Sequence, residues 1–139
     1  MNILFLCVAN SARSQMAEGL AKLLLNNEAH IESAGSAPAK HVHPLAVKVL
    51  REIGIDISHH KSKSIDDLPK EFLQNLDLVI TLCKEEQCPV LPGTFKKESW
   101  ALPDPVNPSI SAQEEIESFR NIRDAIQMKI EKLRAELAT

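Results

Sequence analysis

Short apolar runs that alternate with helix-patterned segments constrain the fold of this chain most. Residues 3–8, 30–34, 77–82 and 100–102 have the apolar or β-branched character of strands. Segments of helical periodicity separate them, and strands that alternate with helices form parallel sheets covered on both faces. The sequence therefore predicts an α/β fold in which a ligand binds at the carboxyl ends of the strands.

Boundary signals place the helices between these strands. A first helix is predicted from an apolar face that consists of Met16, Leu20, Ala21 and Leu24. Pro44 and Gly54 mark the start and stop of a second helix, and a short helix covers residues 67–76. Ser111, with Glu114 three residues later, forms a capping box that opens a long final helix.

The composition excludes several classes of protein. The 139 residues are 44% hydrophobic and 25% charged, which predicts a single domain over residues 1–139. A net charge of -3 and few aromatic residues argue against nucleic-acid binding. No apolar run approaches the about 18 residues of a membrane span, and the apolar start lacks the basic residues of a signal peptide. We therefore expect a cytoplasmic protein with no membrane partner.

The polar residues that carry chemistry follow the predicted strands. Cys7, Cys83 and Cys88 are an odd number of thiols in a chain without an export signal, so a structural disulfide framework is not expected. Each cysteine, and Asp104 with its following proline, lies at or beyond a predicted strand end. Because the carboxyl ends of parallel strands share one edge, a single site can gather them.

The stretch CVANSARS, residues 7–14, joins the first strand to the first helix. Unpaired N–H groups at a helix N-terminus and the helix dipole bind tetrahedral oxyanions, and the same field favours a thiolate. Arg13 adds a planar charged fork, which makes Cys7 a nucleophile aimed at the bound anion. The predicted oxyanion-binding residues are Val8, Ala9, Asn10, Ser11, Ala12, Arg13 and Ser14.

Local roles and simpler alternatives remain open for these residues. The Ser14 hydroxyl can donate to the thiolate, and the Asn10 amide can hold the loop. A lone strand-end cysteine is usually a core residue, and an early helical arginine is usually solvated. An Asp-Pro pair such as that at Asp104 is by itself a turn former. The combination after a buried strand favours the functional interpretation.

A metal site is a further alternative. Cys83 and Cys88 could bind a metal with His59 and His60, or with His41 and His43. Structural zinc sites show paired ligands two to four residues apart in each half, and these histidines resemble ordinary loop residues. The spacing disfavours this interpretation.

CVANSARSQMAEG resembles the active-site loop of the low-molecular-weight protein tyrosine phosphatase superfamily. TLCKEEQCPVLP and KKESWALPDP resemble its thioredoxin-coupled arsenate reductase branch, and the similarity covers the whole chain. The resemblance implies a three-layer αβα sandwich with a four-stranded parallel sheet. Ala9 stands where relatives usually carry glycine, and a position that needs positive φ would make alanine costly.

The resemblance also implies reduction of arsenate to arsenite, with Cys7, Arg13 and Asp104 as nucleophile, oxyanion stabiliser and general acid. Cys83 would then attack Cys7 and release arsenite, and Cys88 would attack Cys83. Thioredoxin, or glutaredoxin with glutathione, would reset the enzyme. It further implies arsenic detoxification by a monomer without a required cofactor, with weak phosphatase side activity.

The same resemblance suggests a cation site beside the loop. Some relatives bind a potassium ion, and the residues that align with its ligands are Asn10, Glu18, Ser33 and Asp66. Oxygen ligands of this kind suit a hard cation.

Two other classes of function stay open. A low-molecular-weight phosphatase that hydrolyses phosphate monoesters through a Cys7 phospho-intermediate needs only Cys7, Arg13 and Asp104, and the absence of tyrosine argues against it. An oxyanion or metal sensor without catalysis is the third class, and a nucleophile paired with an acid argues against that.

Overall fold

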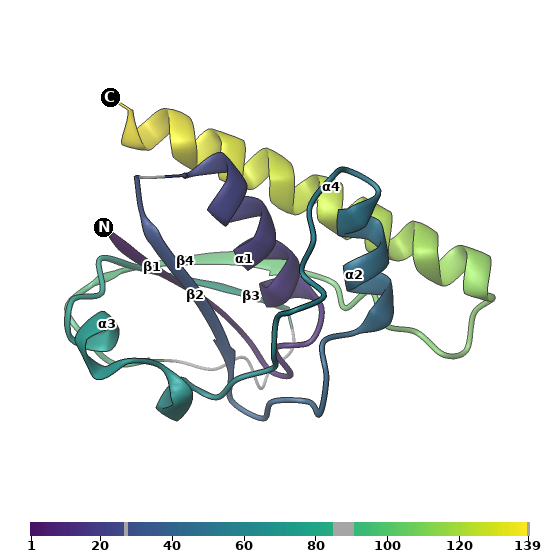
Figure 1. The fold of residues 1–139 in the computed structure, drawn as a ribbon, viewed down its shortest axis with the longest axis horizontal. Coiled ribbons are helices and arrows are strands. Elements are labelled where there is room, and N and C mark those ends of the chain that lie inside the picture. Colours follow the sequence, from purple (N-terminus) through teal and green to yellow (C-terminus); the bar gives the residue numbers. More distant parts are fainter. Residues whose placement is uncertain (27, 85–90, 139) are drawn as a thin grey trace.

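The computed structural model describes residues 1–26, 28–84 and 91–138. Its centre is a four-stranded sheet in the order β2-β1-β3-β4 (Figure 1), in which every neighbouring pair is parallel. The strands are β1 (Asn2–Cys7), β2 (His30–Gly35), β3 (Leu78–Cys83) and β4 (Lys96–Leu102). The predicted parallel sheet is confirmed.

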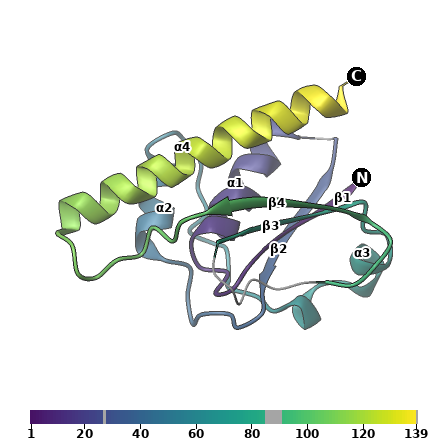
Figure 2. The same cartoon turned by 180° about the vertical axis from the view of Figure 1, so that it is seen from behind.

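Helices cover both faces of the sheet. One face carries α1 (Arg13–Leu24), α2 (Pro44–Arg51) and the long α4 (Ala112–Leu137), as the two opposite views in Figures 1 and 2 show. The 3-10 turn η1 (Ile65–Asp67) and α3 (Lys70–Gln74) lie on the other face. Each face has its own apolar core, so the predicted three-layer αβα sandwich is confirmed.

The element boundaries differ from the predicted ones where side chains are exposed. β4 begins at Lys96 rather than at residue 100, because its first four residues are polar and give no apolar strand signal. The predicted helix over residues 67–76 is the shorter α3, preceded by η1. In the described ranges, no helix is both long and apolar enough to cross a membrane.

The strand register decides what meets at the carboxyl edge. Cys7 pairs with Gly35 of β2, while Cys83 pairs with Leu102 of β4 after a local shift in register. β1 and β3 are direct neighbours, with Leu6 opposite Thr81. The loops after β1, β2, β3 and β4 therefore leave the sheet at the same edge.

Candidate active site

The loop between β1 and α1 is held by the segment that follows β2. The carbonyls of Val8, Ala9 and Ser11 accept hydrogen bonds from the backbone N–H groups of residues 37, 39 and 43, at 2.9, 2.8 and 2.8 Å. Asn10 takes a positive φ of 49° within this loop. Asparagine tolerates the left-handed region better than most residues, and Ala9 does not have a positive φ. The positive φ that would have made alanine costly at position 9 therefore occurs at Asn10, where an asparagine accommodates it.

The Cys7 thiol lies at the base of this loop. Its side chain is buried, with 3% of its surface exposed. The sulfur accepts the Asn10 backbone N–H at 3.2 Å and lies 2.8 Å from the Ser14 hydroxyl. The predicted contact between Ser14 and Cys7 is present.

The direction of the Ser14 hydrogen bond follows from the groups around Asn10. Asn10 Oδ1 accepts the Lys63 backbone N–H at 2.8 Å and the Gln15 side-chain amide N–H at 2.9 Å, and these two hydrogen bonds fix the orientation of the Asn10 amide. Nδ2 therefore donates to the hydroxyls of Ser14 and Ser33, at 2.7 and 3.0 Å. Since Ser14 accepts from Asn10, its own proton is free to be donated to the Cys7 sulfur.

Arg13 ties the loop to the end of β4. Its side chain is buried, and Nη1 donates to the Leu102 carbonyl at 2.8 Å. The chain then continues to Asp104, whose Oδ1 accepts the Val106 backbone N–H at 2.9 Å in a short turn. This turn fixes one oxygen of an otherwise exposed carboxylate.

A cavity of about 200 Å³ opens over the thiol. It brings together three of the predicted catalytic residues, Cys7, Arg13 and Asp104, with part of the predicted loop. The residues that line it are Cys7, Ala9, Ser11, Ala12, Arg13, His43, Asp104 and Val106. A nucleophile, a cation and an acid around one small cavity can bind a tetrahedral anion and transfer its central atom.

The other two predicted thiols differ in what the structure shows. Cys83 is buried at the carboxyl end of β3, beside β1, and takes part in a disulfide. Cys7 is a free thiol. Cys88 lies outside the described residues.

The predicted potassium ligands are only partly brought together. Asn10, Ser33 and Glu18 form one buried chain, with the Ser33 hydroxyl donating to Glu18 Oε1 at 2.5 Å. Asp66 lies in η1 with an exposed side chain, and within the described part of the chain no hydrogen bond or ion pair joins it to Glu18. Glu18 instead meets two ammonium groups, Lys22 at 2.6 Å and Lys63 at 3.3 Å. With lysines at that carboxylate, the residues do not fit a potassium ion.

The charge on Glu18 follows from these partners. Burial alone would raise its pKa, but the hydrogen bonds from Lys22 and Ser33 and the charges of Lys63 and Lys22 hold the pKa below its usual value. Glu18 is therefore an ionised, buried acceptor.

Three residues near the loop were not predicted to belong to this site, although His43 and His60 were considered as metal ligands. His43 caps α2 by accepting the Leu45 N–H at 3.1 Å and also lines the thiol cavity. Gln15 is fully buried and donates to both oxygens of Asn10. Its Oε1 lies 3.0 Å from His60 Nδ1, and burial lowers the pKa of His60 to about 4. His60 therefore donates as a neutral ring and fixes Gln15.

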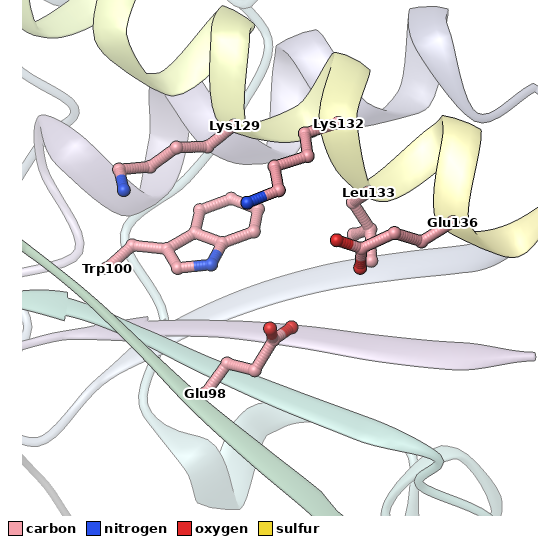
Figure 3. A pocket seen from close by; sticks show the side chains of 6 residues that line it. All are labelled: Glu98, Trp100, Lys129, Lys132, Leu133 and Glu136. Carbon is pink, nitrogen blue, oxygen red and sulfur yellow. The ribbon is translucent and has the colours of Figure 1, made fainter.

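The metal alternative gains no support. Across residues 1–26, 28–84 and 91–138, no three histidine, cysteine or acidic side chains are grouped to hold a metal. A second cavity of about 220 Å³ lies between β4 and α4 (Figure 3), where Trp100 and Glu98 face two lysines of α4. That cavity contains no cysteine, so the thiol cavity is the candidate active site.

Comparisons with known proteins identify the family of the chain. Residues 2–139 match the family model described as low molecular weight phosphotyrosine protein phosphatase. Arsenate reductase 1 of Staphylococcus saprophyticus is 41% identical over 134 residues, which cover 95% of each chain. A solved arsenate reductase in a phosphate-binding state superposes with a TM-score of 0.80 at 34% identity over 98% of both chains. A thioredoxin-dependent arsenate reductase of Corynebacterium glutamicum gives 0.74 at 29% identity, over 99% of this chain and 61% of that one. The chain therefore belongs to the low molecular weight phosphotyrosine protein phosphatase family, and arsenate reductases are among its relatives.

Proposed function

We propose that this protein reduces arsenate to arsenite and serves arsenic detoxification in the cytoplasm as a monomer. The observation that carries the proposal is the Cys7 sulfur, which accepts the Asn10 N–H beneath a cavity lined by Arg13 and Asp104. Similarity to proteins named arsenate reductases supports the choice of anion.

The first step is an attack of the Cys7 thiolate on the arsenic of bound arsenate. A sulfur–arsenic bond forms and an arsenic–oxygen bond breaks, while Asp104 protonates the departing oxygen, which leaves as water. Arg13 and the N–H groups of the loop stabilise the charge on the remaining oxygens. The arsenic is still pentavalent in this adduct.

The reduction is a thiol exchange. Once the disulfide of Cys83 has been reduced by the external thiol donor, the Cys83 thiolate attacks the sulfur of Cys7. A disulfide forms, and the electron pair of the sulfur–arsenic bond stays on arsenic, which leaves as arsenite. Cys88 then attacks Cys83, which frees the Cys7 thiolate and leaves an oxidised Cys83–Cys88 pair. Thioredoxin, or glutaredoxin with glutathione, supplies two electrons to restore both thiols. The position of Cys83 at the end of the strand next to β1 supports the first exchange.

Single-turnover assays test the order of the thiols. With arsenate and no external reductant, the Cys88→Ser variant should release about one arsenite per chain and lose two titratable thiols. Cys83→Ser and Cys7→Ser should release none, and full turnover of the wild type should require an added dithiol protein. Arsenite release by Cys7→Ser would refute the assignment of the nucleophile, and each cysteine variant serves as control for the others.

Phosphate monoester hydrolysis is the second candidate function, because the family model is that of a phosphatase. It requires Cys7, Arg13 and Asp104 but neither of the other thiols. If a phosphate ester is hydrolysed rapidly by the Cys83→Ser/Cys88→Ser protein and no reductant supports arsenite formation, hydrolysis replaces reduction as the main activity.

A further inference from the structure

The buried Glu18 chain raises the question of which cation stabilises the anion loop. From Glu18 Oε1 the hydrogen bonds run through the Ser33 hydroxyl to Asn10 Nδ2, and from there to Ser14 and Cys7. A buried carboxylate at the end of such a chain needs a counter-charge, since an uncompensated buried charge is costly.

Lys63 contacts this chain at two points, Glu18 at one end and Asn10 in the middle. Its Nζ lies 3.3 Å from Glu18 Oε1, the oxygen that also accepts the Ser33 hydroxyl. Its backbone N–H donates to Asn10 Oδ1 at 2.8 Å and fixes the direction of the amide. One residue therefore holds both the carboxylate and the amide that lies between it and the thiol.

Lys22 is the weaker candidate for this role. It binds the other oxygen, Glu18 Oε2, as an i,i+4 partner on α1, and its side chain is 49% exposed, against 23% for Lys63. The Lys22 pair is the shorter of the two, at 2.6 Å against 3.3 Å, but it holds the carboxylate oxygen that does not accept the Ser33 hydroxyl. Lys63 holds the oxygen that does accept it, and its backbone N–H holds the Asn10 amide as well, so Lys63 fixes the chain more directly. A third neighbour, His60, lies 3.8 Å from Glu18, but burial lowers its pKa to about 4, so its ring is neutral at neutral pH and supplies no counter-charge.

We propose that Lys63 is a positioning residue, whose ammonium group takes the place of a bound monovalent cation and holds Glu18, Ser33, Asn10 and Ser14 in the arrangement that activates Cys7. The proposal rests on Cys7 as the nucleophile of the proposed function. It predicts that the reactivity of the thiol does not depend on potassium, in contrast to the expectation drawn from the family resemblance.

The experiment measures alkylation of Cys7 by iodoacetamide, at one pH, in the Cys83→Ser/Cys88→Ser background where Cys7 is the only thiol. Rates are compared in potassium chloride and in tetramethylammonium chloride of equal ionic strength, because the methyl groups of tetramethylammonium keep its charge away from carboxylate and hydroxyl oxygens that would coordinate potassium. The wild-type lysine should give equal rates in both salts. Lys63→Met should react about tenfold more slowly, the loss of one charge-assisted contact, while Lys63→Arg should stay within about threefold of the parent.

Lys61→Met is the matched control, because it removes the same charge from an exposed side chain two residues away. It should react like the parent. In Lys63→Ala, which opens space beside Glu18, potassium but not tetramethylammonium should recover part of the rate and raise the melting temperature.

Two results would overturn the proposal: a saturable potassium response in the protein with Lys63 intact, or Lys63→Met rates equal to those of Lys61→Met. If Lys63→Met fails to fold, the proposal is tested by the alkylation rate of Lys63→Arg and by the comparison of the two salts on the parent protein. The assay contains no arsenate, so loss of arsenate reduction alone would count against the proposed function and not against this one.

Discussion

Replacing Gly35 by alanine should damage the anion loop without touching any catalytic group. A Cβ at this position would point at the Val8 carbonyl oxygen, far inside the 3.0 Å that real Cβ atoms keep, and would lie 3.0 Å from the Asn10 nitrogen. Both obstacles are backbone atoms, and Val8 is tied to residue 37 by a 2.9 Å hydrogen bond. Relief therefore requires the loop to move by roughly half an ångström against β2.

The expected losses of stability and of kcat/KM in Gly35→Ala follow from the size of that movement. Overpacking in a rigid site costs about 1–3 kcal/mol, and the upper half of that range applies because no side chain can rotate away. A 1 Å misplacement near the reacting atoms can cost about 100-fold in rate, so a shift of half that size should lower kcat/KM by about tenfold. Stability is measured by urea unfolding and activity by arsenite formation with a supplied dithiol protein.

Gly54→Ala provides the control for this prediction. Gly54 has φ of 84°, and a Cβ added there would meet no atom within 4 Å, so alanine is strained at this position but meets no obstacle. The Gly54→Ala variant should lose about 1–2 kcal/mol of its free energy of unfolding and keep the kcat/KM of the wild type. If Gly35→Ala keeps kcat/KM within about twofold and the urea midpoint of the wild type, the steric argument for the loop is wrong.

Three further predictions concern the core, the charge network and the anion. Phe119→Ala should lower the free energy of unfolding by about 3–5 kcal/mol in urea, because the ring is fully buried in the core beneath α4. Burial lowers the pKa of His60 from its ordinary value of 6.5 to about 4 in the folded protein, so the unfolded chain binds the proton first as pH falls. Stability should therefore be full above pH 6.5 and decline toward pH 4, and His60→Gln should flatten this decline in unfolding curves measured across that range. Arg13→Lys should reduce kcat/KM by about 100-fold, since an ammonium cannot both hold the Leu102 carbonyl and grip two anion oxygens; near-normal kcat/KM would contradict that role.

Much of this architecture could be predicted from local patterns. The apolar runs at β1 and β3, the helical faces of α1 and α4 and the Ser111 cap are short-range signals, and the structure has each of them. β4 was predicted too short because its first residues lie at an exposed sheet edge, where burial imposes no apolar pattern. Cys7, Arg13 and Ser14 could be predicted as a group because they lie within eight consecutive residues that connect a strand to a helix.

The sequence by itself determined the parallel sheet, the anion loop after its first strand and the residues of that loop that carry chemistry. Only the tertiary structure decided that Asp104 reaches the same cavity, that Cys83 leaves the strand beside Cys7, and that Lys63 rather than Asp66 stands at Glu18. The physical reason is that strand and helix patterns depend on neighbours a few residues apart. Contacts between Glu18 and Lys63, 45 positions apart, depend on how the loops pack at the carboxyl edge.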